Sequence, residues 1–194
     1  MRLVYAVPMT FVFGYAIAAC GNGEPAKPVV DAAQADAAQA DAALGCDAAC
    51  KAFTATLTKG AASLPLERAF WGANGPVDAP TSVRVELYRG GENSCPEMNS
   101  PSPKQTVVIA ALPVMNGAIA GNDTSSAVSL LDFRGALTMA AIARATSKQM
   151  LNGRSSLAAT PGFVAFDINA TIEGGIVLAG HVYATHCASL DERP

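Results

Sequence analysis

The sequence predicts a mostly β fold, in the form of one antiparallel β-sandwich or barrel-like domain. Three observations support this prediction: two alternating apolar–polar segments near the C-terminus, further short segments of β character before them, and Gly, Pro and Asn residues that separate the segments. Short strands divided by turn residues are typical of antiparallel sandwiches and barrels. The alternative is an α+β domain with helices near residues 47–58 and 136–149.

The clearest predicted element is a hairpin formed by residues 162–172 and 176–187. In the first segment, apolar side chains from Val164 to Ile172 occupy every second position and therefore face one side of a strand. Between the two segments, Glu173-Gly174-Gly175 supplies residues that tolerate the positive φ angles of a tight turn.

Earlier segments show β character less strongly. The predicted strands are residues 66–71, 82–88, 106–112 and 127–133. Residues 136–149 are ambiguous, because their alanines permit a helix whereas their position among strands favours a strand. Asn152-Gly153 predicts a turn. Within these strands Trp71 is expected in the core or at a sheet edge, and Arg84 and Glu86 are expected on an ordinary polar outer face.

The first 19 residues have the composition of a secretory signal peptide. Arg2 is the only charged side chain before Cys20, and the chain from Leu3 to Ala19 is nearly all apolar. This run of roughly 17 residues is at the short limit for crossing a bilayer. An uncleaved membrane anchor is therefore the alternative.

The end of this leader, Ile17-Ala18-Ala19-Cys20, resembles the lipobox of bacterial lipoprotein precursors. The resemblance implies cleavage before Cys20 and attachment of acyl chains such as palmitate to that cysteine. Because Gly21 and not Asp follows, the resemblance also implies a lipid-anchored protein of the cell envelope, at the outer membrane. A signal peptide cleaved elsewhere, with an ordinary Cys20, is the alternative.

Residues 20–45 are predicted to be a tether, and residues 46–194 a single β-rich domain. The tether repeats a five-residue unit that begins at Asp31, Asp36 and Asp41 and contains no large apolar side chain, so it cannot form a core. It is expected to be disordered or helical. Roughly 25 such residues span about 80 Å when fully extended.

The four cysteines after the tether are expected to form two disulfides, as is usual in an exported domain. Four cysteines allow three pairings, and the pairing Cys46–Cys50 with Cys95–Cys187 is favoured. A zinc site is the alternative, because Cys46 and Cys50 together with His181 and His186 offer four suitable ligands. On one strand, however, residues five apart face opposite sides, so no metal site and no cofactor is predicted.

Catalytic signals are weak, and no catalytic residue is assigned. His186, Ser189 and Asp191 are the residue types of a hydrolytic triad. Because such triads assemble in space, three such residues close together near a chain terminus are little evidence for an active site. Glu92, Glu97 and Asp123 are interpreted as solvated loop residues. The net charge of −3 without a basic stripe excludes a nucleic-acid partner on electrostatic grounds.

These observations predict a membrane-anchored envelope lipoprotein whose β domain has a non-enzymatic binding or structural role. Its expected partners are the lipid bilayer, through acylated Cys20, and an envelope protein or glycan. A small periplasmic hydrolase or carbohydrate-active protein is the first alternative, and a metal-binding lipoprotein is the second.

Overall fold

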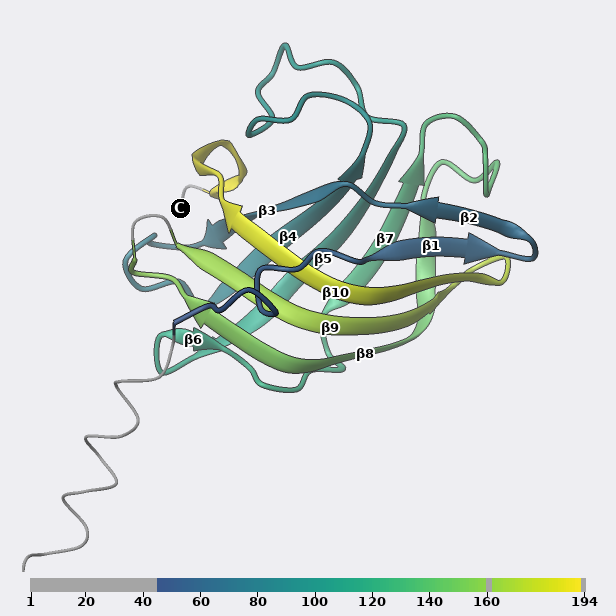
Figure 1. The fold of residues 1–194 in the computed structure, drawn as a ribbon. Coiled ribbons are helices and arrows are strands. Elements are labelled where there is room, and N and C mark those ends of the chain that lie inside the picture. Colours follow the sequence, from purple (N-terminus) through teal and green to yellow (C-terminus); the bar gives the residue numbers. More distant parts are fainter. Residues whose placement is uncertain (1–44, 160–161, 193–194) are drawn as a thin grey trace, which may run out of the picture. The chain divides into compact units, whose positions relative to one another are not determined.

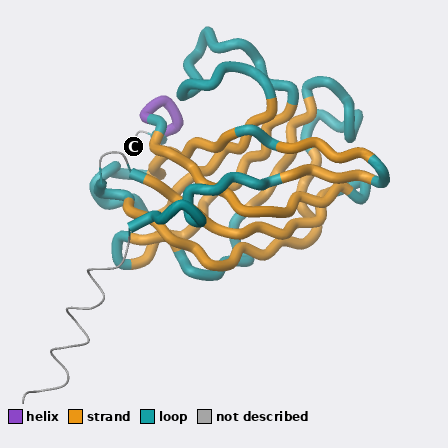
Figure 2. Tube along the Cα trace, in the orientation of Figure 1, coloured by secondary structure: helices purple, strands orange, loops and turns teal. Residues whose placement is uncertain are grey.

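The computed structural model describes residues 45–159 and 162–192 of the chain. The strands are β1 Thr56–Lys59, β2 Ala62–Pro65, β3 Arg68–Asn74, β4 Ser82–Arg89, β5 Gln105–Met115, β6 Ala118–Ile119, β7 Ala127–Asp132, β8 Ala143–Ser156, β9 Phe163–Ile172 and β10 Ile176–His186. A short 3-10 helix, η1 Ala188–Leu190, follows β10 (Figure 2). The predicted signal peptide and the tether up to residue 44, with Cys20, lie outside the described residues.

Seven strands close into a barrel in the order β3-β4-β5-β7-β8-β9-β10 (Figure 1). Neighbouring strands are antiparallel, except that β10 and β3 run parallel and close the barrel with His186 opposite Trp71. On the same edge of β10, strand β1 pairs with residues 177–179, and β2 extends from β1. Closure gives each barrel strand a partner on both sides, so the barrel strands present few unpaired backbone groups.

The predicted mostly β fold is confirmed, and the domain takes the barrel form. The α+β alternative is wrong for the described residues. Where helices were the alternative, residues 48–51 form a turn, 56–59 are β1, 136–142 belong to a loop and 143–149 begin β8. The predicted hairpin is also confirmed, because β9 and β10 pair over their whole length around Gly174 and Gly175, which both have positive φ.

The core fills the inside of the barrel with alternate side chains from every long strand. Trp71 has no exposed surface, and its indole N–H donates to the carbonyl oxygen of Gly162. On β9, the alternate positions from Val164 to Ile172 are all buried, as their spacing predicts. The largest fully buried apolar side chains are Trp71, Phe166, Leu57, Leu87, Ile109, Leu112, Leu130, Met150, Ile172, Ile176 and Leu178.

The predicted turn at Asn152-Gly153 is wrong, because these residues lie within β8. They form a bulge at which the pairing with β9 shifts register, and Asn152 has a φ of 56°. The bulge lets another segment cross closely: the N–H of Gly153 donates to Gly121, and a Cβ at Gly153 would lie 2.2 Å from the carbonyl oxygen of Ala120. Glycine is thus required there by close approach of two backbones.

Strand β5 is longer than the predicted segment 106–112, because it continues through Pro113 to Met115. Pro113 lies opposite Ser82 of β4, and its carbonyl oxygen accepts the N–H of Ala120. A proline lacks an N–H but can still accept, so it is tolerated where only its carbonyl is needed.

Candidate functional site

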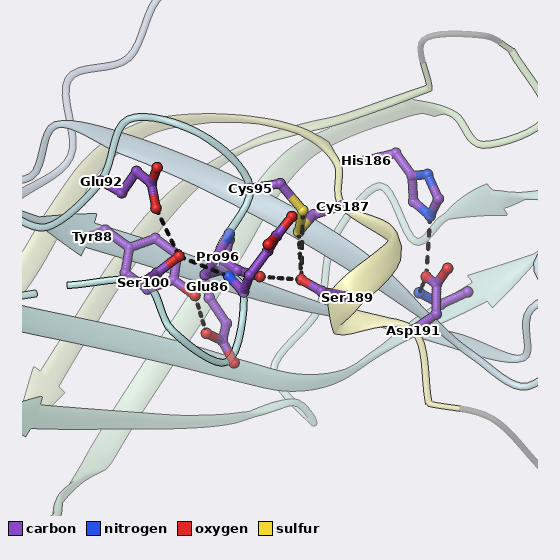
Figure 3. The surroundings of a disulfide bond; sticks show 12 residues. Glu86, Tyr88, Glu92, Cys95, Pro96, Ser100, His186, Cys187, Ser189 and Asp191 are labelled. Carbon is purple, nitrogen blue, oxygen red and sulfur yellow. Dashed lines mark hydrogen bonds and ion pairs between the residues drawn. A yellow bond between two sulfur atoms is a disulfide. The ribbon is translucent and has the colours of Figure 1, made fainter. Parts of the chain in front are cut away.

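The disulfide Cys95–Cys187 fastens a loop over the outer face of the barrel (Figure 3). This loop, residues 90–104, connects β4 to β5 and is called the β4–β5 loop below. Beneath it, Phe70 and Tyr88 point away from the barrel interior yet are only 8% and 6% exposed. The loop and the disulfide therefore form a second, small core on the outside of β3 and β4.

A polar cluster lies on the same outer face, where Arg84, Glu86 and Tyr88 occupy alternate positions of β4. Arg84 Nη2 lies 2.5 Å from Glu86 Oε1, and the Tyr88 hydroxyl donates to Glu86 Oε2. Burial, followed by the hydrogen bond to Glu86 and its negative charge, raises the pKa of Tyr88 far above its usual range. The predicted ordinary polar face is thus wrong at Glu86, which is 7% exposed.

The hollow between this loop and the sheet is too small for an organic ligand. Its cavity volume is about 20 Å³, which is room for one or two water molecules. Ligand pockets in proteins are typically several hundred Å³. Tyr88, which lines this hollow, therefore packs beneath the loop and does not border a cavity of ligand size.

The residues of the hydrolytic triad do not assemble. His186 Nε2 lies 3.0 Å from Asp191 Oδ1, but Ser189 is directed to the disulfide and its hydroxyl donates to the carbonyl oxygen of Pro96 (Figure 3). Asp191 Oδ1 also accepts the N–H of Ala73 at 2.8 Å. The pair of His186 and Asp191 thus holds the C-terminal segment against β3. The His186 ring also packs on Trp71, with 4.5 Å between the two ring centroids.

A second His–acid pair lines an open cavity of about 380 Å³ on the barrel wall. His181 Nδ1 lies 2.7 Å from Asp167 Oδ1, and His181 Nε2 lies 2.9 Å from the carbonyl oxygen of Cys50. Hydrogen bonds from Asn152 and His181 lower the pKa of Asp167. Both ring nitrogens of His181 therefore face acceptors of the protein's own chain, the Asp167 carboxylate and the Cys50 carbonyl.

The same histidine connects the start of the domain to the barrel. The N–H of Thr54 donates to the carbonyl oxygen of His181, and the N–H of His181 donates to the Thr54 hydroxyl. At Gly180, which has a φ of 130°, a Cβ would lie 2.5 Å from the carbonyl oxygen of Thr54. The pair of His181 and Asp167 is therefore part of the attachment of residues 46–54 to β9 and β10.

The cysteines form the favoured pairs, Cys46–Cys50 and Cys95–Cys187. The first disulfide removes both thiolates that the zinc alternative needs. Across the described residues, no cluster of three or more His, Cys, Asp or Glu side chains could hold a metal ion. Cys20, the predicted site of acylation, lies outside the described part of the chain.

Asp123, predicted to be a solvated loop residue, is instead buried with 8% exposure. Its carboxylate accepts hydrogen bonds from the hydroxyl and N–H groups of both Ser125 and Ser126. Burial opposes ionisation, but these hydrogen bonds outweigh it and lower the pKa of Asp123 to about 2. The segment is a structural turn, whose backbone pairs with Met150.

The most distinctive surface feature is the loop between β7 and β8, residues 133–142, called the β7–β8 loop below. It exposes three large apolar side chains: Met139 at 92%, Phe133 at 55% and Ile142 at 50%. Sequence reasoning assigned Phe133 to a strand and left 136–149 ambiguous, so it missed this group. The signal was Gly135, which interrupts the alternation directly after Phe133.

The β7–β8 loop is held by a dense set of contacts. Asp132 accepts the N–H groups of Arg134, Leu137 and Thr138, and these and other hydrogen bonds lower its pKa despite partial burial. Leu137 is 3% exposed and joins the barrel core, and Lys59 Nζ donates to its carbonyl oxygen at 2.6 Å. The exposed apolar side chains are therefore presented by a fixed loop.

Within residues 45–159 and 162–192, no helix has the length and hydrophobicity needed to cross a membrane. Comparison of the chain with protein-family models, with curated proteins and with solved structures gives no match.

Proposed function

We propose that this protein is a lipid-anchored protein of the bacterial cell envelope, in which acylated Cys20 holds a non-enzymatic β-barrel that binds a partner or has a structural role. The observation that carries the proposal is the pairing of the cysteines. The chain has five, and the two disulfides use Cys46, Cys50, Cys95 and Cys187. Cys20 is left with no barrel cysteine to pair with, directly after three small or apolar residues that complete the lipobox-like motif.

The arrangement of polar groups supports a binding or structural role over a hydrolytic one. Both histidines are paired with aspartates, and those aspartates hold segments of the protein's own chain. The residues that line the His181 cavity include no Ser or Thr, and their one cysteine, Cys50, is oxidised. A nucleophile beside a base with a free nitrogen is what an acyl-transfer site requires.

The proposal is tested by expressing the full precursor in a bacterium with and without Cys20→Ser and following labelled palmitate and membrane fractionation. The full precursor should incorporate the label and sediment with the outer membrane, whereas Cys20→Ser should do neither. The matched control is Cys46→Ser with Cys50→Ser, which also removes thiols but should remain labelled and membrane-bound. Unlabelled wild type, or equal membrane association of wild type and Cys20→Ser, would overturn the proposal.

A further inference from the structure

We propose that the β7–β8 loop docks onto an anionic lipid bilayer, with Phe133, Met139 and Ile142 entering the interface between headgroups and acyl chains. The inference deepens the proposed function and rests on it, because an acylated Cys20 would keep a bilayer within reach of the barrel. The docking proposal is based on the structure of the β7–β8 loop, which is held in place, exposes apolar side chains and has basic residues around it.

The β7–β8 loop presents a group of exposed apolar side chains. Water-exposed Met139, Phe133 and Ile142 lie within ten residues of one another on one loop. Clustered exposed apolar groups mark interaction surfaces more often than scattered ones do. Because Leu137 and Asp132 already hold the loop in place, little conformational entropy would be lost on docking.

Basic side chains lie around these apolar groups. The cations that adjoin the loop are Arg134 within it, Arg144 just after it, and Lys59, which donates to the Leu137 carbonyl. The neighbouring acids, Asp132 and Glu173, both accept backbone N–H groups. Exposed basic residues beside apolar ones match the chemistry of an anionic bilayer surface, in a chain whose net charge is −3.

The tether makes the geometry feasible. The described chain begins at Gly45, next to the Cys46–Cys50 disulfide on the barrel wall, whereas the β7–β8 loop lies at one end of the barrel (Figure 1). Strand β8, with 14 residues, is the longest strand and spans roughly 46 Å. The roughly 25 residues after Cys20 reach about 80 Å when extended, so anchor and loop can meet the same bilayer.

The experiment uses the chain from residue 20 onward with Cys20→Ser, which removes the acyl group, and measures sedimentation with vesicles. The vesicles contain equal parts phosphatidylglycerol and phosphatidylcholine, or phosphatidylcholine alone. We expect binding to the anionic vesicles that weakens as salt is raised. The double variant Phe133→Ser with Met139→Ser should lower the partition coefficient by about tenfold or more. Arg134→Glu should lower it by about fivefold or more.

Matched control variants remove the same chemistry elsewhere. Met115→Ser removes a methionine that is 63% exposed but lies at the end of β5, and Lys51→Glu reverses an exposed charge beside the Cys46–Cys50 disulfide. Both should bind as the parent chain does. Because all these side chains are exposed, melting temperatures should stay close to that of the parent.

Three outcomes would overturn the docking proposal: no binding to anionic vesicles, equal binding to neutral vesicles, or equal losses in the loop and control variants. None of these outcomes depends on Cys20, which is Ser throughout. Palmitate labelling of the full precursor could therefore succeed while vesicle docking fails, or the reverse, and the two proposals are tested separately.

Discussion

The two disulfides should differ strongly in what they contribute to stability, because they close loops of very different length. Cys95–Cys187 joins residues 92 apart, whereas Cys46–Cys50 joins residues 4 apart. Loop-closure entropy in the unfolded chain assigns about 4–5 kcal/mol to the first and about 2 kcal/mol to the second. Removing the first also frees the loop that covers Phe70 and Tyr88, which adds to its cost.

The perturbation is a pair of double variants, Cys95→Ala with Cys187→Ala and Cys46→Ala with Cys50→Ala. Each keeps the Cβ atoms and removes one bridge. Unfolding in urea, followed by circular dichroism without reductant, should show the first variant to be less stable than the second by at least about 2 kcal/mol. For a domain of this size that difference corresponds to roughly 4–8 °C in melting temperature. Equal losses, or a larger loss from Cys46–Cys50, would refute the reasoning.

Two further predictions concern buried ionisable groups. Because the pKa of folded Asp123 is about 2, below that of the unfolded chain, its ionised form contributes stability above pH 4 that is lost as the pH falls through 2. Asp123→Asn should therefore cost about 2 kcal/mol at pH 7 in urea unfolding and almost nothing near pH 2; an equal cost at both would contradict the hydrogen-bond account. The raised pKa of Tyr88 predicts the opposite sign, with stability that is full below the unfolded value near 10 and is lost as the pH rises. In the chain from residue 20 onward with Tyr183→Phe, Tyr88 is the one tyrosine left. Absorbance at 295 nm should therefore show phenolate only as the barrel unfolds. Phenolate in the folded protein near pH 10 would argue against burial of Tyr88 beside Glu86.

The parts of the fold that could be predicted are those that local sequence determines. Strands β9 and β10 alternate apolar and polar residues around a Gly-Gly turn, and each feature acts on its own neighbours. The closing pair of β10 with β3 could not be predicted, because it joins His186 to Trp71 across 115 residues of sequence and depends on how all intervening strands curve.

Side-chain environments were harder to predict than strands. Glu86 has the sequence pattern of a solvated outer face, but it is buried, and its carboxylate is paired with Arg84 and the Tyr88 hydroxyl. Asp123 sits in a polar segment that resembles any surface turn, but Ser125 and Ser126 enclose its carboxylate. In both cases the burial of the carboxylate depends on contacts that the alternation of apolar and polar residues does not predict.

The central claim is that Cys20 is the acylated first residue of the mature protein. Intact-mass measurement of the protein extracted from membranes, without reductant, tests this most directly. The account predicts a chain that begins at Cys20, carries acyl groups on that residue and contains two disulfides among its other four cysteines. A mass that begins at Met1, or an unmodified Cys20, would contradict it.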